Sequence, residues 1–348
     1  MRRILSTLFI LTLLLFQRLP IQAQWKRQNS GTDADFRGMS AVSARVAWVS
    51  GSKGTVLRTL NGGASWEKVG VPEAESLDFR DIQAFNANVA YVMSAGPGAL
   101  SRIYKTTDGG KSWRIQFRNA NAKAFYDGFA FWDSANGIAM SDSIGGVFPL
   151  LVTGDGEAWN LLNSKRIPPA LPNEGGFAAS GTNISVNGKN DVWFATGGVK
   201  ARVFRSADRG KSWNVVDSPL LGGPPRGVFS IAFQNRRNGV IVGGDYEKPT
   251  RSDKTAAYSR DGGKTWRLSA KMPSGFRSAV AYLPGASSVW VAVGTNGSDF
   301  SRDGGETWRS LDTGNYNALS FYDSSVGWAV GPHGVISRFV GLPKEVRP

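Results

Sequence analysis

Three features of the sequence predict an all-β fold made of repeated antiparallel sheets. An eight-residue box occurs nearly unchanged as SRDGGKTW at Ser259–Trp266 and as SRDGGETW at Ser301–Trp308. Related boxes end in tryptophans that recur at intervals of roughly 42 to 54 residues. Each interval also holds short β-branched and aromatic runs ended by glycine, such as VGWAVG at Val326–Gly331. Four short strands per interval of this length describe the blades of a β-propeller.

The boxes are expected to be hairpin turns between the two outer strands of each blade. Their glycines supply the positive φ angles that tight turns need, and the Asp or Asn side chain can accept hydrogen bonds from nearby backbone N–H groups. The closing tryptophan is expected to pack between blades. Because six turns on separate blades cannot converge on one substrate, we interpret them as structural and not as catalytic or calcium-binding. The structural box residues are Asn61, Asp108, Asp208, Asp261, Asp303, Trp66, Trp113, Trp159, Trp213, Trp266 and Trp308.

One box departs from the template. In VTGDGEAW at Val152–Trp159, Gly154 stands where the box aspartate is expected. Since glycine has no side chain to accept hydrogen bonds, this copy predicts a looser turn.

The two ends of the repeat array predict a seventh blade. Residues Asn317–Val340 supply three strands after the last box, and Gln24–Gln28 (QWKRQ) supply a tryptophan-led strand with no box before it. We expect this N-terminal strand to complete the seventh blade, which removes the open edges of the ring. The prediction is one seven-bladed β-propeller of four-stranded blades over residues 24–341, followed by a tail at 342–348.

Two long insertions interrupt the regular spacing. Asn160–Gly181 joins blades three and four, and Asp245–Ala256 interrupts blade five. Long loops carry function more often than the scaffold does.

Composition excludes several kinds of chemistry. The chain has no cysteine and one histidine, which excludes thiol catalysis, a thiolate metal site and a multi-histidine metal site. We expect no cofactor and no metal. Residues 1–23 have a basic start, an apolar run too short to span a bilayer and Ala23 at a plausible cleavage point, as in a secretory signal. We therefore expect a periplasmic or secreted bacterial protein, monomeric and without a transmembrane segment after cleavage.

The charge suggests the partners. The formal net charge is +14, and removing Arg2, Arg3 and Arg18 with the signal leaves 14 − 3 = +11. Such a surface attracts acidic proteins, anionic glycans or membrane headgroups. Export argues against nucleic acid, so the expected partner is a protein or an anionic glycan. The alternative is that the basic residues only solubilise the outer strands.

A candidate site lies at the mouth of the channel, where the innermost strands begin. When the blades are aligned on their apolar runs, arginine stands at this position in three of the seven. Guanidinium groups fork onto carboxylate or phosphate, which predicts an anion-recognition mouth. The alternative is that these arginines cap strands and pair with neighbours such as Asp35, Asp78 or Asp81. The candidate mouth residues are Arg37, Arg80, Arg277, Arg226, His333 and Asp127.

The repeats also resemble those of known families. The boxes are similar to the Asp-box, or bacterial neuraminidase, repeats of sialidases, sortilin-type receptors and some glycoside hydrolases. The fuller phrase VGWAVGPHGVISR, together with SRDGGETW, resembles the repeat of photosystem II assembly and stability factors and their bacterial relatives. This resemblance covers nearly the whole mature chain. It implies a secreted seven-bladed propeller that acts by binding proteins and carries an arginine-lined face.

Two functions remain open. The first is a non-enzymatic exported scaffold or assembly factor, favoured by the structural character of every repeated motif. The second is a sialidase-like glycoside hydrolase or a carbohydrate-binding propeller. A RIP tripeptide precedes the first box in sialidases, whereas here it follows the third box, at Arg166–Pro168. A hydrolase would need two facing carboxylates, and Asp127 with Glu174 is the best pair that the sequence offers.

Overall fold

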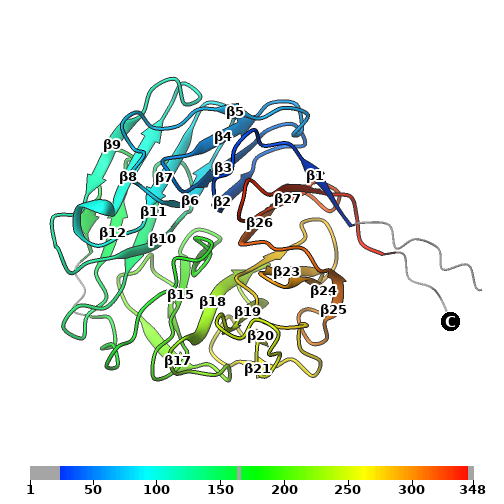
Figure 1. Ribbon diagram of the computed structural model, residues 1–348. Coiled ribbons are helices and arrows are strands. Elements are labelled where there is room, and N and C mark those ends of the chain that lie inside the picture. The colour runs from blue at the N-terminus through cyan, green and yellow to red at the C-terminus, as the bar shows by residue number, and fades with distance from the viewer. Residues whose placement is uncertain (1–23, 163–165, 344–348) are drawn as a thin grey trace, which may run out of the picture.

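The computed structural model describes residues 24–162 and 166–343, which form seven four-stranded antiparallel sheets around a central channel (Figure 1). This architecture confirms the predicted seven-bladed β-propeller. The expected signal at residues 1–23 lies outside the described residues, as does most of the expected tail. We number the blades 1 to 7 by the order of their innermost strands.

Each blade runs from an innermost strand at the channel to an outer strand at the rim. The innermost strands are β2 (Phe36–Ala41), β6 (Phe79–Ala84), β10 (Tyr126–Phe131), β14 (Ile184–Asn187), β18 (Arg226–Phe233), β22 (Ala279–Tyr282) and β26 (Ala318–Phe321). The second strands are β3 (Ala47–Gly51), β7 (Ala90–Ser94), β11 (Gly137–Ser141), β15 (Asp191–Ala195), β19 (Gly239–Asp245), β23 (Trp290–Gly294) and β27 (Gly327–Val330).

The outer half of each blade carries the boxes. The third strands are β4 (Val56–Thr59), β8 (Arg102–Thr106), β12 (Leu150–Thr153), β16 (Arg202–Ser206), β20 (Ala256–Ser259), β24 (Gly297–Ser301) and β28 (Ile336–Phe339). The outer strands are β5 (Glu67–Lys68), β9 (Arg114–Arg118), β13 (Asn160–Leu161), β17 (Asn214–Asp217), β21 (Arg267–Leu268), β25 (Arg309–Asp312) and, in blade 7, β1 (Trp25–Gln28). The 3-10 turn η1 (Gly98–Leu100) precedes β8.

The second strand of each blade is the most deeply buried. Every residue of β3, β7, β11, β15, β19, β23 and β27 is buried. A neighbouring blade covers each face of these strands, so their sequences are continuous apolar runs and not alternating ones.

Seven apolar clusters fill the interfaces between neighbouring blades. Six contain a box tryptophan at the rim, and the seventh contains Trp25. In the cluster between blades 5 and 6, for example, Trp308 is fully buried together with Val240 and Trp290. The box tryptophans therefore contribute to the packing of one blade on the next.

The N-terminal strand closes the ring, as predicted. β1 pairs antiparallel with β28, with Trp25 opposite Phe339. The Trp25 indole is 5% exposed, donates from Nε1 to Ser298 Oγ at 3.1 Å, and lies 5.8 Å from the ring of Tyr316. Strands from opposite ends of the described chain thus lie side by side in blade 7 (Figure 1).

The box aspartates bind the backbone of their own turns. Asp261 accepts hydrogen bonds from the backbone N–H groups of Lys264 and Thr265, both at 3.0 Å, and from Thr265 Oγ1 at 2.6 Å. In the equivalent turn, hydrogen bonds from Ser112 lower the pKa of Asp108 to about 2. Asn61 accepts in the same way from Ser65 N at 2.9 Å. The carboxylate therefore acts within its own turn.

The expectation for the third box is wrong. The aspartate of this box is Asp155, one residue after Gly154. Its Oδ1 accepts hydrogen bonds from Thr153 Oγ1 at 3.1 Å and from the N–H groups of Glu157 and Ala158 at 2.8 and 3.0 Å. The box is one residue shorter between its aspartate and its tryptophan, so the aspartate keeps its spacing from the preceding threonine. The backbone hydrogen bonds of the turn are of the same kind as in the other boxes, but Ala158 stands where they have a Ser or Thr whose hydroxyl also donates to the aspartate.

A substitution at Asp303 tests the role of the box. Asp303→Ala is expected to lower the free energy of unfolding by about 1–2 kcal/mol, because the N–H groups of Glu306 and Thr307 and the Thr307 hydroxyl lose their acceptor. Asp303→Asn should lose less than half of this, because asparagine occupies the equivalent position at Asn61. Urea unfolding followed by tryptophan fluorescence measures both values. Equal losses for the two variants would contradict this role.

Candidate functional site at the channel mouth

A segment of the chain closes one end of the central channel. The channel holds a cavity of about 350 Å³ lined by residues of all seven innermost strands and by Ser180, Gly181 and Thr182. These three residues belong to the long connection between blades 3 and 4. We call Gly175–Thr182 the plug segment. It lies at the end of the channel where the connections between blades run, which is the mouth.

The plug segment is tied to blades on every side. Ser180 Oγ donates to the Ser278 carbonyl of blade 6 at 2.9 Å, and the Ile231 N–H of blade 5 donates to the Thr182 carbonyl at 2.8 Å. Gly175 and Gly197 of blade 4 exchange backbone hydrogen bonds at 3.2 and 2.9 Å. These bonds hold the segment across the mouth.

Two of the predicted mouth arginines bind the plug segment. Arg37 Nη1 donates to the Ala179 carbonyl and Arg80 Nη1 to the Ala178 carbonyl, both at 3.3 Å. Arg80 Nε also donates to Asp78 Oδ2 at 2.7 Å. The pair of Arg80 with Asp78 agrees with the alternative interpretation of the sequence, in which these arginines pair with neighbouring aspartates. The sequence did not predict that both arginines would bind backbone carbonyls of the insertion. Both guanidinium groups are partly buried and hold the chain's own backbone.

Two buried carboxylates, Asp81 and Asp127, and the half-buried Asp142 lie beneath the plug segment. Gly176 N donates to Asp142 Oδ1 at 2.8 Å, and a Cβ added at Gly176 would lie 2.8 Å from Asp127 Cγ. A Cβ at Gly181, where φ is +72°, would lie 2.2 Å from Asp81 Cγ. The approach of the backbone to these side chains explains why the insertion carries glycine at these positions.

Burial dominates the electrostatics of this carboxylate group. It raises the pKa of Asp81 well above its usual range, although Phe129 N donates to this side chain at 2.8 Å. Burial, and after it the charge of Asp142, also raise the pKa of Asp127 well above its usual range. Burial raises the pKa of Asp142 to about 6. Burial at the mouth therefore makes each of these side chains harder to ionise than an exposed aspartate.

The pH dependence of stability tests the Asp142 placement. Its pKa of about 6 in the folded state lies above the ordinary aspartate value of 3.8, so the folded state binds the proton more strongly than the unfolded state does. The resulting stabilisation is complete below pH 3.8 and is lost as the pH rises through 6, by about 2–3 kcal/mol. Asp142→Asn is expected to reduce this fall in the free energy of unfolding between pH 4 and 7, measured by urea unfolding. Asp133→Asn, a change at an exposed carboxylate whose pKa is lowered, is the control; an equal effect of both would contradict the prediction.

The structure places Arg277 inside blade 6 and not at an accessible surface. Its side chain is fully buried and donates from Nε to Asp299 Oδ2 at 2.6 Å and from Nη1 to Asn296 Oδ1 at 2.7 Å. Asp299 is itself 1% exposed. The expectation that Arg277 faces a ligand is therefore not met, because its hydrogen-bonding capacity is used within the blade.

The other two predicted residues are His333 and Arg226. His333 sits in the turn between β27 and β28, its side chain 80% exposed and its Nδ1 3.4 Å from Asp33 Oδ1. Arg226 opens β18, and its Nε is buried without a hydrogen-bond partner. Of the six predicted residues, Arg37, Arg80 and Asp127 lie together around the plug segment, and Arg226 lies in a pocket beside it.

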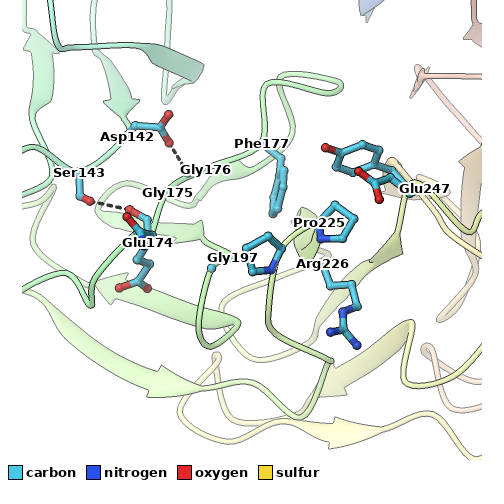
Figure 2. Close-up of a pocket in the computed structure, with 14 residues that line it drawn as sticks. Asp142, Ser143, Glu174, Gly175, Gly176, Phe177, Gly197, Pro225, Arg226 and Glu247 are labelled. Carbon is cyan, nitrogen blue, oxygen red and sulfur yellow. Dashed lines mark hydrogen bonds between the residues drawn. The ribbon is translucent and has the colours of Figure 1, made fainter.

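That pocket, which we call the mouth pocket, has a volume of about 530 Å³. Figure 2 shows Asp142 and Ser143 on one side and Pro225, Arg226 and Glu247 on the other, with Phe177 between them. The Phe177 ring stacks on Phe229 with centroids 3.7 Å apart. Plug residues and turns of blades 3, 4 and 5 together make an open surface with aromatic, cationic and anionic parts.

Glu174 supports the pocket wall. The side chain is 2% exposed, accepts from Arg202 Nε at 2.8 Å and from Thr196 Oγ1 at 2.6 Å, and both carboxylate oxygens are engaged. The pair proposed for a hydrolase, Asp127 with Glu174, is thus formed by two buried side chains. Asp127 is 1% exposed and lies under Gly176. These two carboxylates are not presented to a substrate in the mouth pocket.

Sequence reasoning missed several residues of this site. Asp142, Phe177, Arg202 and Tyr246 were not candidates. Phe177 belongs to the first insertion and Tyr246 to the second, so the length of these loops was the available signal. Asp142 directly follows β11 and Arg202 is the first residue of β16, and neither position carries a signal of its own.

Two further properties concern only the residues that the structure describes. Over residues 24–162 and 166–343 there is no group of three or more His, Cys, Asp or Glu side chains that could hold a metal ion. Within the same ranges, no helix has the length and apolar character needed to span a membrane.

The fold and the boxes define the class of the protein, an Asp-box β-propeller with a closed channel mouth. Comparison with known proteins makes this more specific. The profile of a family described as "Photosynthesis system II assembly factor YCF48" matches residues 19–120, and that of the BNR/Asp-box repeat matches residues 257–268. The chain is therefore similar to photosystem II assembly factors of the Asp-box propeller type, as its repeats predicted.

Individual relatives agree with this. The chain is 26% identical over 220 residues to the photosystem II stability/assembly factor HCF136 of Guillardia theta, an alignment covering 59% of this chain and 53% of that protein. It thus spans about half the length of this relative. Photosystem II assembly protein Ycf48 of Synechococcus sp. (strain JA-2-3B'a(2-13)) is 26% identical over 310 residues, covering 76% and 83% of the two chains. A solved structure titled "YCF48 bound to D1 peptide" shares the fold, with a TM-score of 0.65, 16% identity and coverage of 91% and 97%.

Proposed function

We propose that this chain is a non-enzymatic propeller that binds a segment of a protein partner at its mouth, in the manner of an assembly factor. Its relatives are named as photosystem II assembly factors, and one solved structure with the same fold carries a peptide. We extend the proposal to an exported monomer, with a propeller domain over residues 24–341 that follows a signal at residues 1–23. These finer assignments come from the sequence.

The observation that carries the proposal is the open mouth pocket. Its wall holds the Arg226 guanidinium, whose Nε is buried and unpartnered, beside Tyr246, which is 50% exposed. A peptide can place a carboxylate or a backbone carbonyl on Arg226 and an apolar side chain on the tyrosine ring. The two carboxylates considered for hydrolysis are both buried. The pocket is thus suited to recognition.

Capture of partners from an envelope extract tests the proposal. The chain from residue 24 is immobilised, and bound proteins are identified by mass spectrometry. A specific partner captured by the wild type should be lost with the double change Arg226→Glu and Tyr246→Ala. Arg118→Glu, an exposed arginine at the end of β9, is the matched control and should retain the partner. Equal capture by the pocket variant and the control would contradict the proposal.

The carbohydrate alternative is tested on the same protein. Hydrolysis of fluorogenic sialosides or glycosides by the wild type, with loss of this activity in Asp127→Asn or Glu174→Gln, would replace the proposed function by that of a glycoside hydrolase. We expect no turnover above background.

A further inference from the structure

A second strongly charged site lies on the opposite face of the propeller, where the boxes and the turns between first and second strands meet. At the junction of blades 4 and 5, a cavity of about 530 Å³ is lined by Arg205, Arg236, Arg237, Asp261 and Lys264. A neighbouring cavity of about 340 Å³ shares Arg205 and Lys264 and is walled by valines that include the half-buried Val215 and Val216. We call the two cavities together the basic groove.

Blades 1 and 4 carry an arginine at the same place of the repeat, with different residues opposite it. In blade 1, the residue before the box is Arg58, which is paired across the strands with Glu67: Nη2 donates to Oε2 at 2.8 Å. In blade 4 the equivalent arginine is Arg205, and the residue opposite it is Asn214. The cation is kept and its cross-strand carboxylate is absent. Arg205 Nε is buried without a hydrogen-bond partner.

The turn that faces this arginine, between the first two strands of the next blade, also carries an additional cation in blade 5 compared with blade 2. In blade 2, Asn86 caps the turn between β6 and β7, and Arg58 Nη1 donates to the carbonyl of the following residue, Ala87, at 2.9 Å. In blade 5, Asn235 caps the equivalent turn through Arg237 N at 2.9 Å, so Arg236 stands where blade 2 has Ala87.

The carboxylates at the groove do not neutralise it. Asp191 is 1% exposed and is shared by Arg236 at 2.6 Å and Arg205 at 3.6 Å. Asp261 is bound within its box, and these hydrogen bonds hold its pKa below the usual range. Four cations and two anions leave a net charge of +2. Arg237 and Lys264 are exposed, and Lys264 also lines the cavity walled by valines.

We propose that the basic groove binds an extended acidic segment of another protein, with its carboxylates on Arg205, Arg237 and Lys264 and an aliphatic side chain on Val215 and Val216. Charge complementarity selects carboxylates, and forked guanidinium groups bind them in two-point contacts. The groove has an apolar wall beside its cations, which suits a chain that alternates acidic and aliphatic residues. The inference is independent of the mouth pocket, because the two sites lie on opposite faces.

The repeat supplies a matched pair of variants for the test. Lys264 and Lys111 occupy the same position in their boxes, both are exposed, and only Lys264 lines the groove. Binding of a fluorescein-labelled peptide that repeats Gly-Glu-Val-Glu is measured by anisotropy at low ionic strength. Lys264→Glu is expected to weaken binding about fivefold or more, and Lys111→Glu less than about twofold, because only the first change removes a contact. Arg237→Glu should weaken it as Lys264→Glu does.

Three outcomes would overturn the proposal. Equal weakening by Lys264→Glu and Lys111→Glu would show attraction by net charge alone. Equal affinity for the peptide with Gln in place of Glu would show that carboxylates are not recognised. Selective binding of phosphatidylglycerol vesicles through Lys264, with no binding of the peptide, would assign the groove to a lipid headgroup. These outcomes are measured with the peptide and do not depend on partner capture at the mouth pocket. A failure of the basic groove proposal is therefore distinguishable from a failure of the proposed function.

Discussion

Replacing Trp25 by alanine is expected to lower the free energy of unfolding by about 3–5 kcal/mol, because it removes a large buried aromatic side chain from the strand that closes the ring. The indole is 5% exposed, contacts the rings of Tyr316, Phe321 and Phe339, and binds Ser298 through its N–H group. Blade 7 would keep the three strands β26, β27 and β28, which follow one another in the chain. It would lose most of the packing that holds the fourth strand, β1. Urea unfolding followed by far-UV circular dichroism measures the loss.

Trp66→Ala is the control for this experiment. Trp66 immediately precedes the outer strand of blade 1, where Trp25 begins the outer strand of blade 7, and it is only partly buried. Its replacement should cost about 1–2 kcal/mol, since less apolar surface is exposed to water. A loss for Trp25→Ala no larger than that for Trp66→Ala would show that closure by β1 is not a major source of stability.

Replacing Arg277 by alanine is expected to cost about 3–5 kcal/mol, the usual effect of removing one partner of a buried ion pair. Asp299 is 1% exposed, and the change leaves its buried carboxylate without the cation that it binds. It also leaves Asn296 Oδ1 without its donor. Urea unfolding of the single variant gives the value. The double variant Arg277→Met with Asp299→Asn should recover part of the loss, because no unpaired charge remains.

Arg80→Ala, a change at a partly exposed arginine of β6 in blade 2, is the control. Its side chain is 31% exposed and paired with Asp78, also partly exposed, so the expected loss is about 1 kcal/mol or less. Similar losses for Arg277→Ala and Arg80→Ala would contradict the contrast between a buried and a surface pair.

The fold was predictable because the repeat encodes it seven times. Box spacing, strand runs and the tryptophan of QWKRQ each indicated the ring and its closure, and β1 pairing with β28 confirmed the count. The misreading of the third box has a physical cause. The aspartate must lie two residues after Ser or Thr to accept from its hydroxyl, and Asp155 keeps that spacing from Thr153. Alignment from the tryptophan end hid this spacing.

The site was less predictable because its partners come from distant parts of the chain. The sequence marked Arg37 and Arg80 but not the carbonyls of Ala178 and Ala179, which a loop brings to them from another blade. Arg277 looked accessible because its partner Asp299 lies 22 residues away, and strand register alone brings the two together. Insertion lengths showed that the loops were unusual, but not where they would lie.

The pairing of β1 with β28 has a consequence for how the protein is made. During synthesis the N-terminus emerges first, and each of blades 1 to 6 can form from neighbouring segments of the chain. β1 can pair only after β28, near the other end of the chain, has been made. Until then the nascent molecule is an open arc with an unsatisfied edge at each side. A circular permutant that carries residues 24–28 after residue 341 would make blade 7 from contiguous sequence, and its refolding should be faster with the same final structure.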